Sequence, residues 1–307
     1  SGVFLLLHRV CSGAMGCIFG RSDDAVVAEY FDGKVVWVTG ASGGLGEALC
    51  VALCRLAEPE GLVLSARNRS ELERVKAQCL ALRPDLNAVV LPLDLADVDT
   101  LPAVADTALR AFGGVVDVLV NNGGSGFRGL AEQTPLEVDR TMMNVNYFSG
   151  VALVKALLPG WLERCEGHVV QISSVQGFFG MPGRSAYAAT KHALLGFYDA
   201  LRAEVADSGI VVTMVAPGYI NTRHSQNAAR GNGGEYPEGD VLQKGVPPEG
   251  LAPQVLAAAA RQLPEIVPAA WDAKAAQLLR RLLPTVLFGI MKRRARRERA
   301  GMSAPPE

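Results

Sequence analysis

Residues 34 to 46 read KVVWVTGASGGLG, an apolar run that leads through a glycine-rich turn into a helical pattern. Such a turn at a helix N-terminus binds pyrophosphate, because the missing side chains let the backbone approach and unpaired N–H groups attract the negative charge. Glycines also serve ordinary tight turns, but this turn follows the first strand of a βαβ unit, which favours a nucleotide. The turn residues that we assign to the nucleotide are Gly40, Ser42, Gly43, Gly44, Leu45 and Gly46.

The rest of the chain continues the alternation of strands and helices. Apolar, β-branched runs occupy 34–40, 62–67, 88–94, 115–122, 168–174 and 210–218, with a short run at 265–269. Helical patterns lie between them, near 44–57, 69–83, 99–112, 136–164, 185–207 and 252–262. Nearly continuous apolar strands are typical of a sheet with helices on both faces. The sequence therefore predicts an α/β fold, a Rossmann-type doubly wound parallel sheet of about seven strands, with a C-terminal amphipathic helical appendage.

Composition and charge divide the chain into parts. Its 307 residues are 49% hydrophobic, which excludes a disordered protein. Residues 292–299 hold six basic groups and one acid, so this end carries +5 and the rest of a chain with net charge −1 carries −6. We expect a leader over 1–31, a nucleotide-binding domain over 32–267, and an amphipathic helix with a basic tail over 268–307.

The leader has an unusual composition. It begins with Ser1, contains VFLLL at positions 3–7 and holds no acid before Asp23. This composition fits the remnant of a membrane anchor, a signal or a transit segment, and it fits a leader without structure equally well. The chain contains no run of 18 apolar residues, so we expect no complete transmembrane helix in it.

The cysteines and histidines predict neither disulfides nor a metal site. The six cysteines include no CxxC pair, so a reducing compartment is the default expectation. Cys50 and Cys54 lie four residues apart in an expected helix and are interpreted as small buried hydrophobes. The four histidines lack any metal-binding spacing, and we expect no metal.

The C-terminal segment combines an apolar pattern with basic residues. Pairs of apolar residues repeat every four positions from Leu278 to Met291, which predicts an amphipathic helix that Pro284 kinks or splits. The basic cluster suits anionic lipid headgroups, so we favour peripheral membrane contact through this helix. A plain solvated end is the alternative, and no motif supports nucleic-acid binding.

The position of one arginine bears on the choice of nucleotide. Dinucleotide folds place an acid roughly 20 residues beyond the last glycine, where it holds the ribose 2′-hydroxyl of NAD. Counting from Gly46 reaches Ala66 and then Arg67. A guanidinium pairs with a 2′-phosphate, so Arg67 favours NADP(H); a solvated arginine at a strand end is the alternative.

Three later residues suggest acid–base chemistry. Tyr187 and Lys191 lie four residues apart in an expected helix and share a face, so the ammonium lowers the pKa of the phenol from about 10. A tyrosine tuned in this way exchanges a proton with an alcohol near neutral pH. Ser174 ends a strand at the carboxyl edge of the sheet, where open α/β folds bind ligands.

With these residues in their order, the chain closely resembles the short-chain dehydrogenase/reductase family over residues 32–222. TGASGGLG matches the cofactor turn of the family, and Gly123 stands where alanine is usual. The resemblance implies a catalytic tetrad of Asn146, Ser174, Tyr187 and Lys191. It implies further cofactor contacts at Arg67, Asp94, Leu95, Asn122, Gly123, Gly124, Tyr187, Lys191, Pro217, Gly218, Ile220 and Thr222, and substrate contacts at Ser174, Gln176, Tyr187 and Tyr219.

The stretches SSVQG, RSAYAATKHA, APGYINT and LLPTVLFGIMKRRARRER resemble more particularly the member 7B branch of this family, membrane-associated reductases. This resemblance implies an NADP(H)-dependent oxidoreductase of lipid metabolism that acts on the carbonyl or alcohol of a small hydrophobic substrate. Lipid-like, steroid-like and acyl-dihydroxyacetone-phosphate-like compounds are candidates. It also implies a membrane-associated protein facing a reducing compartment, with the endoplasmic reticulum, the peroxisome or another organelle left open. A homodimer and a homotetramer are both left open.

The resemblance also implies roles for the tetrad. We expect Ser174 to hydrogen-bond the substrate carbonyl and Tyr187 to protonate the developing alkoxide. Lys191 is expected to lower the pKa of Tyr187 and to hold the nicotinamide ribose, and Asn146 to position a relay water. The alternative is a cofactor-binding scaffold or sensor without turnover.

Residues that follow strand ends are expected near the substrate: Phe127, Arg128, Gln176, Phe178 and Tyr219. Residues 223–250, where Gly, Asn, Pro and Glu replace aliphatic residues, are expected to form a loop over the site that sets specificity.

Overall fold

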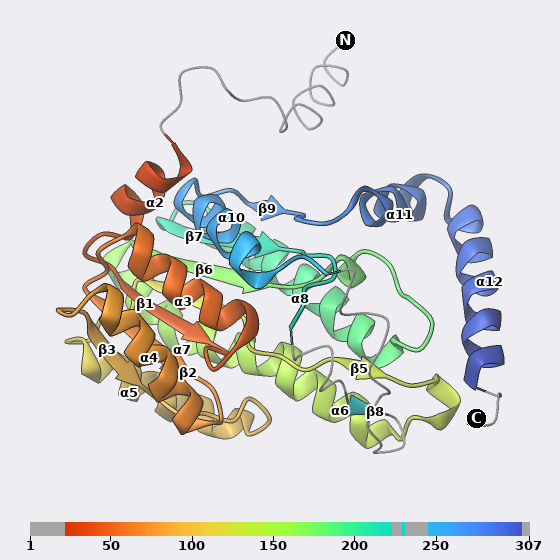
Figure 1. Ribbon diagram of the computed structural model, residues 1–307, viewed down its shortest axis with the longest axis horizontal. Helices are drawn as coiled ribbons and strands as arrows, with labels where there is room; N and C mark the ends of the chain where they lie inside the picture. The colour runs from red at the N-terminus through yellow and green to blue at the C-terminus, as the bar shows by residue number, and fades with distance from the viewer. Residues whose placement is uncertain (1–21, 223–228, 231–244, 303–307) are drawn as a thin grey trace, which may run out of the picture.

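The computed structural model describes residues 22–222, 229–230 and 245–302 (Figure 1). Seven parallel strands form one sheet in the order β3-β2-β1-β4-β6-β7-β9. They are β1 (Val35–Thr39), β2 (Gly61–Ser65), β3 (Asn87–Val90), β4 (Val118–Asn121), β6 (Gly167–Ile172), β7 (Ile210–Val215) and β9 (Glu265–Ile266). Every expected strand is present, and the order reverses between β1 and β4. The Rossmann-type prediction is therefore confirmed.

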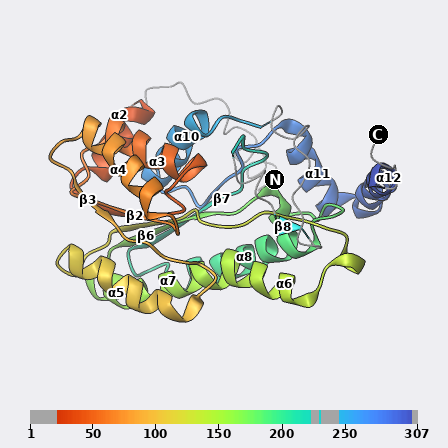
Figure 2. The same ribbon diagram turned by 60° about the horizontal axis from the view of Figure 1, so that its bottom comes forward.

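Helices cover both faces of the sheet (Figure 2). One layer consists of α2 (Asp23–Phe31), α3 (Gly44–Leu56), α4 (Arg69–Leu82) and α10 (Pro248–Ala260). The other consists of α5 (Leu101–Ala111), which the 3₁₀ turn Val98–Thr100 precedes, α7 (Ser149–Arg164) and α8 (Ser185–Glu204). Strand β1 shows why its pattern is continuously apolar: Val36 and Val38 join the core of the first layer, whereas Val35 and Trp37 join that of the second.

The helix expected over 136–164 is divided in the structure. Helix α6 (Leu136–Met143) passes into a π-helical turn, Asn144–Phe148, before α7 begins. A π turn accommodates more residues than an α turn and re-aims the side chains that follow it. Here it carries Asn146, which is 4% exposed. The apolar periodicity of the segment gives no sign of this interruption.

Helix α2 belongs to the packed body of the protein. It contacts α3 and α10, and its Val27 and Phe31 are fully buried in the core of that layer. Burial of two such side chains favours docking by about 3–6 kcal/mol, which is ample for a short helix. The packed body therefore begins before residue 32, the expected start of the nucleotide-binding domain, because Val27 and Phe31 lie four positions apart and both face the core. The expected remnant at 1–21 lies outside the described residues.

A buried histidine joins α2 to the sheet. The Tyr30 hydroxyl lies 2.7 Å from Nδ1 of His168 on β6, and Nε2 of His168 lies 2.9 Å from Oγ1 of Thr213 on β7. The Thr213 hydroxyl donates its only proton to the Leu263 carbonyl at 2.8 Å. Thr213 must therefore accept from Nε2–H, and Nδ1 of the neutral ring accepts from Tyr30. Burial lowers the pKa of His168 to about 3, with a smaller contribution from the charge of Lys34.

Two helices follow the sheet, α11 (Trp271–Leu282) and α12 (Pro284–Met302). The split expected at Pro284 is confirmed, since Leu283 leaves the helical conformation and α12 begins at the proline. Among the described helices, none is both long and apolar enough to cross a membrane.

A small second sheet lies near the substrate side. It pairs β5 (Phe127–Arg128) with β8 (Ala229–Arg230) in parallel. The 3₁₀ turn Ala131–Gln133 follows β5, and the 3₁₀ turn Val175–Gly177 follows β6. Most of the specificity loop expected over 223–250 lies outside the described residues.

Candidate active site

A cleft of about 860 Å³ opens at the carboxyl ends of the strands. It gathers nearly all the residues that the sequence singled out. Those lining it are Gly40, Ser42, Gly43, Gly44, Leu45, Arg67, Asp94, Leu95, Asn122, Gly123, Gly124, Ser174, Gln176, Tyr187, Lys191, Pro217, Gly218, Tyr219, Ile220 and Thr222. Gly46 and Asn146 are not among the lining residues, and each has a structural explanation.

Gly46 closes the glycine turn from behind. A Cβ at this position would lie 2.1 Å from the Gly40 carbonyl oxygen, so only glycine lets the helix approach the strand this closely. Gly40 has φ +67°, a conformation that favours glycine. In contrast, a Cβ at Gly43 would meet nothing within 4 Å, which leaves room above the N-terminus of α3. This open cradle fits a pyrophosphate.

The loop after β4 holds the glycine turn in place. The Thr39 hydroxyl accepts hydrogen bonds from the backbone N–H groups of Asn122 (3.1 Å) and Gly123 (3.0 Å). The Asn122 side-chain amide donates to the Thr39 carbonyl at 3.0 Å. Both loops are thereby fixed at the edge of the cleft.

Gly123, the departure from the family pattern, has a partner in Leu95. A Cβ at position 123 would lie 2.5 Å from Cδ1 of Leu95, and 3.3 Å from the Gly40 backbone nitrogen. The Leu95 side chain thus fills the volume that an alanine methyl would need. The glycine in place of the usual alanine is therefore matched by a neighbouring side chain.

Arg67 and Asp94 lie at the strand ends that face the adenine half of such a cleft. Both are exposed, and both line the cleft. Oδ1 of Asp94 accepts from the Ala96 backbone N–H at 2.9 Å, which fixes the carboxylate at the strand end. Among the described residues, no carboxylate forms an ion pair with Arg67, whereas the neighbouring Glu71 is paired with Arg74 at 2.9 Å.

The candidate acid–base residues come from two elements that meet at the cleft. Ser174 caps the 3₁₀ turn after β6, where its hydroxyl accepts from the Gln176 N–H at 3.2 Å. Tyr187 and Lys191 project from one face of α8, and the Lys191 ammonium lies 5.5 Å from the centroid of the Tyr187 ring. The ammonium also donates to the Ile172 carbonyl at 3.2 Å, which ties it to the end of β6.

The surroundings of this group act on its protonation. Burial raises the pKa of Tyr187, while its hydrogen bond with Ser174 and the charge of Arg184 oppose that rise. Burial lowers the pKa of Lys191 to about 8. Lys191 was expected to lower the pKa of the phenol, but in the protein alone burial raises this pKa, and the cation whose charge opposes the rise is Arg184.

Asn146 supports the site from behind. Its Oδ1 accepts from the Ser125 N–H at 2.7 Å, and its Nδ2 donates to the Ser125 carbonyl at 2.9 Å and to Oγ1 of Thr190 at 3.2 Å. These bonds join the loop after β4 to α8. The side chain is therefore engaged with the protein, and its expected role with a relay water stays a prediction.

The outer part of the cleft mixes apolar and basic side chains. Its lining residues include Arg128, Val138, Met142, Val145, Met181 and Arg184. Of the five residues expected near the substrate, Arg128, Gln176 and Tyr219 line the cleft. Phe127 instead packs beneath it against Met142, and Phe178 packs against the C-terminal helices, because both rings are drawn into apolar clusters.

Arg184 is the functional candidate that sequence reasoning missed. It directly precedes α8, and its guanidinium donates to the Phe127 carbonyl at 2.9 Å. Its spacing of three residues before Tyr187 was the only available signal.

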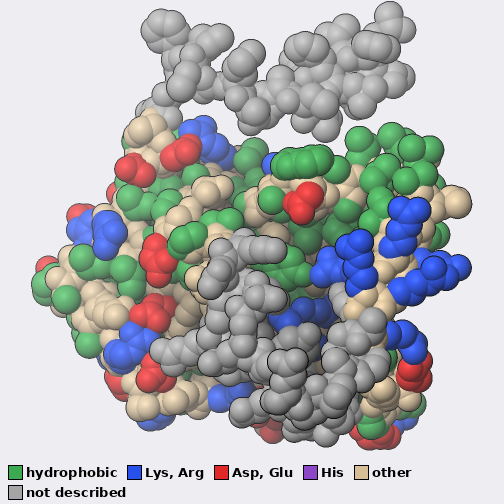
Figure 3. All heavy atoms as spheres, turned by 45° about the vertical axis from the view of Figure 1, so that its right-hand side comes forward, with side chains coloured by type: hydrophobic (Ala, Val, Ile, Leu, Met, Phe, Trp, Pro, Cys, Tyr) green, Lys and Arg blue, Asp and Glu red, His purple; other side chains and the backbone are tan. Residues whose placement is uncertain are grey.

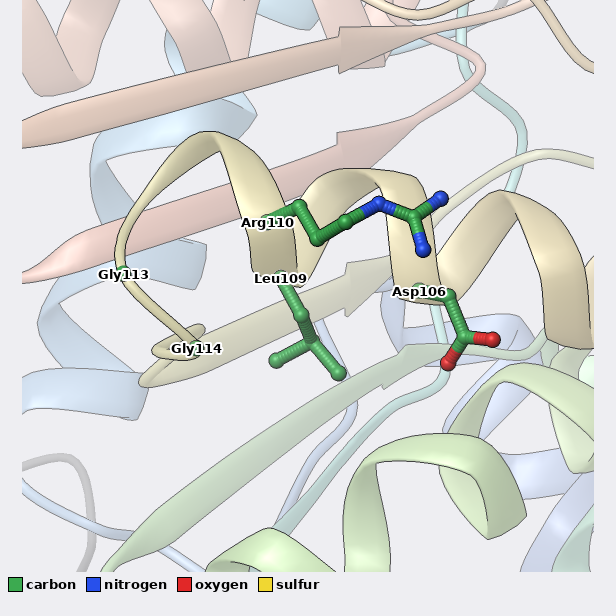
Figure 4. A pocket seen from close by; sticks show the side chains of 5 residues that line it. All are labelled: Asp106, Leu109, Arg110, Gly113 and Gly114. Atoms are coloured by element: carbon green, nitrogen blue, oxygen red, sulfur yellow. The ribbon is translucent and has the colours of Figure 1, made fainter.

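A second, smaller hollow of about 380 Å³ lies beside the end of α5 (Figure 4). It is lined by Asp106, Leu109, Arg110, Gly113 and Gly114. The two glycines lead towards the amino end of β4, so this hollow lies at the edge of the sheet opposite the cleft. None of its residues belongs to the group described above.

None of the cysteines that the structure describes lines the cleft. Cys50, Cys54 and Cys79 are buried, and all three belong to the core of the first helical layer, as predicted for the first two. In the part of the chain that the structure describes, no three His, Cys, Asp or Glu side chains are placed to hold a metal ion.

The fold and the cleft together define a Rossmann-type oxidoreductase with a dinucleotide site. A family model described as short chain dehydrogenase matches residues 34–233. The dehydrogenase/reductase SDR family protein 7-like of Anopheles gambiae is 46% identical over 276 residues, which cover 87% of this chain and 85% of that protein. Dehydrogenase/reductase SDR family member 7B of Bos taurus is 42% identical over 88% of this chain and 84% of that protein. The chain belongs to the short-chain dehydrogenase/reductase family.

Solved structures agree with this assignment at the level of the fold. A short-chain dehydrogenase/reductase from Burkholderia phymatum in complex with NAD has a TM-score of 0.72 at 24% identity, over 82% of this chain and 94% of that one. An alcohol dehydrogenase from Thermococcus sibiricus complexed with 5-hydroxy-NADP has a TM-score of 0.64 at 24% identity, over 76% and 95%. The protein is an oxidoreductase with an NAD(P)-binding fold.

Proposed function

We propose that the protein transfers a hydride between NADP(H) and the carbonyl or alcohol carbon of a hydrophobic substrate. The observation that carries the proposal is the meeting of Ser174, Tyr187 and Lys191 in the cleft that also contains the glycine cradle. A positioned proton donor beside a cofactor site is what carbonyl reduction requires.

Ser174 and Tyr187 would act on the substrate oxygen during reduction. When bound, NADPH supplies the hydride. The Ser174 hydroxyl donates a hydrogen bond to the substrate carbonyl oxygen, which stabilises the negative charge that develops there. The Tyr187 phenol then donates its proton to this oxygen. Since burial raises the pKa of Tyr187, the phenol is neutral at pH 7, which is the form that reduction needs.

Lys191 would act on Tyr187 and on the cofactor. Its ammonium is held at the end of β6 by the Ile172 carbonyl, close to the face of the Tyr187 ring. There it stabilises the phenolate left by proton transfer and donates hydrogen bonds to the ribose next to the nicotinamide. With a pKa of about 8, it is mostly protonated at pH 7.

The preference for NADP(H) is supported by the position of Arg67. This exposed guanidinium lines the cleft at the end of β2, and no described carboxylate pairs with it. A 2′-phosphate would supply the missing anion, whereas NAD would leave the arginine with nothing but water.

The substrate class is supported by the outer cleft. Val138, Met142, Val145 and Met181 offer an apolar wall, which fits a lipid-like or steroid-like body. The same wall includes the guanidinium groups of Arg128 and Arg184, and in the described structure the buried Oε1 of Gln176 has no hydrogen-bond partner. A hydrophobic carbonyl compound with a polar or anionic end, such as an acyl-dihydroxyacetone phosphate, matches both features.

The proposal is tested by replacing Tyr187 with Phe, which removes the proton donor and keeps the ring. We expect turnover of NADPH with a panel of long-chain ketones and dihydroxyacetone phosphate esters to fall ~100- to 10,000-fold. NADPH binding, followed by its fluorescence, should survive. Tyr147→Phe, a partly buried tyrosine outside the cleft, is the matched control.

Two results would count against the proposal. Unchanged turnover in Tyr187→Phe would remove the tyrosine from the reaction. Binding of NADPH without consumption by the native protein, across the whole panel, would favour the alternative of a scaffold or sensor.

A further inference from the structure

The outer surface of α11 and α12 exposes a group of large apolar side chains. We define it by Trp271, Leu278, Leu282, Leu283, Val286 and Ile290, which are 46–81% exposed. On α11, Trp271, Leu278 and Leu282 share one helical face by their spacing. Figure 3 shows hydrophobic side chains gathered at the upper right of the molecule, with Lys and Arg side chains below them. Patches of this kind on a soluble surface mark an interaction site.

Basic side chains continue this surface along α12. Lys292, Arg293, Arg296 and Arg297 are exposed, and none of them forms an ion pair with any residue that the structure describes. By helical spacing, Arg293 and Arg297 extend the stripe that Val286 and Ile290 begin. Figure 3 shows the basic groups following the apolar ones along the helix. The surface is therefore apolar at one end and cationic at the other.

The inner surface of the same two helices packs against the segment that follows Ser174, beside the active site. Leu287 is 2% exposed and packs with Val175 and Phe179, in the segment that directly follows Ser174. Leu279 of α11 joins this cluster. Near the other end of α12, both terminal nitrogens of Arg299 bind the Glu132 carboxylate, at 3.0 and 2.8 Å. Helix α12 is thus held at both ends, beside the segments that flank the substrate side of the cleft.

The chemistry of the outer surface selects its occupant. A two-fold contact with a second copy would bring the unpaired cations of both chains together and would be opposed by their repulsion. An anionic bilayer accepts both halves of the surface, because acyl chains take up the exposed apolar groups and headgroups pair with the lysine and arginines. Charge complementarity therefore favours the bilayer.

We propose that the outer surface of α11 and α12 docks on an anionic lipid bilayer, and that this docking places the neighbouring cleft close to the membrane, which delivers the substrate. The docking itself is independent of catalysis. The delivery of substrate rests on the proposed function.

Flotation of the full chain with vesicles of phosphatidylcholine and phosphatidylserine tests the docking. One variant combines Trp271→Gln, Leu282→Gln and Ile290→Gln; a second combines Arg293→Gln, Arg296→Gln and Arg297→Gln. The control removes three exposed cations from other helices: Arg55→Gln, Arg110→Gln and Lys155→Gln. We expect the native chain and the control to float, and both α11–α12 variants to partition on the order of 100-fold less.

Melting temperature and NADPH binding, which should match those of the native chain, establish that the variants are folded. Equal flotation of all four proteins, or no flotation of the native chain, overturns the proposal. So does a native dimer that the apolar variant dissociates in the absence of vesicles, since a second copy would then be the occupant.

Substrate delivery is measured separately. A long-chain ketone embedded in the vesicles should be reduced with at least tenfold lower kcat/KM by the two variants, while a short soluble ketone is reduced at the native rate. If both substrates lose rate equally, delivery is refuted although docking stands. If neither is reduced by the native chain, the proposed function fails, and flotation still decides the docking.

Discussion

The buried His168 predicts a specific dependence of stability on pH. Its ring is neutral in the folded protein, where burial lowers its pKa to about 3, but it protonates near its ordinary pKa of about 6.5 when the chain unfolds. The contribution is therefore complete above pH 6.5 and is lost as the pH falls towards 3. Between pH 7 and pH 5 the free energy of unfolding should drop by about 2 kcal/mol through this group alone.

The groups around the His168 ring add little to this change in unfolding free energy between pH 7 and pH 5. Tyr30 and Thr213 contact the ring through neutral hydroxyls. Lys34 lowers the pKa of Glu166 by pairing with it at 2.8 Å, so this carboxylate stays largely ionised at pH 5. A loss of about 2 kcal/mol is a sizeable part of the 5–15 kcal/mol typical of a folded domain.

Urea denaturation at pH 7 and pH 5, followed by the fluorescence of the buried tryptophans, measures the effect. We expect His168→Gln to be less stable than the native chain at pH 7, because glutamine cannot satisfy both Tyr30 and Thr213 in the same geometry. Its loss between the two pH values should be smaller by about 2 kcal/mol. His192→Gln changes an exposed histidine and serves as the control. The reasoning is refuted if native protein and His168→Gln lose the same free energy on acidification.

Three further predictions concern the cleft. Replacing Arg67 with Gln should weaken NADPH binding by about tenfold or more and leave NADH binding unchanged, as measured by fluorescence titration; an equal loss for both would contradict the role of the guanidinium. Since the pKa of Lys191 is about 8, the Kd for NADPH should rise between pH 7 and pH 9, and Lys191→Met should bind more weakly and without that rise. Gly46→Ala should lower the melting temperature, because its Cβ would meet the Gly40 carbonyl at 2.1 Å, whereas Gly43→Ala should not; similar melting of the two variants would count against the close approach.

The sequence was sufficient for the sheet because each strand signal is local. The apolar runs are continuous wherever both faces of the sheet are covered, and the glycine turn follows the first of them. The same locality explains the correct grouping of Ser174, Tyr187 and Lys191, since the strand end and the helix face each follow from short-range spacing.

Other features depend on contacts between distant segments and could not be predicted. The Asn146 side chain is engaged by Ser125 and Thr190, which are 21 and 44 residues away along the chain. Arg184 reaches the cleft only because the segment before α8 folds back to Phe127, 57 residues earlier. Helix α2 becomes part of the core through α3 and α10, and its own short sequence does not reveal these contacts.

The contact between Leu95 and Gly123 also bears on how this family diversifies. Because the leucine methyl lies where an alanine methyl would be, a chain with alanine at position 123 must hold a smaller or differently turned side chain at position 95. The two positions should therefore change together among related sequences, although 28 positions separate them. Of two ancestral substitutions at these positions, the one that removes side-chain volume would be tolerated before the one that adds it. The order of the two substitutions is therefore constrained.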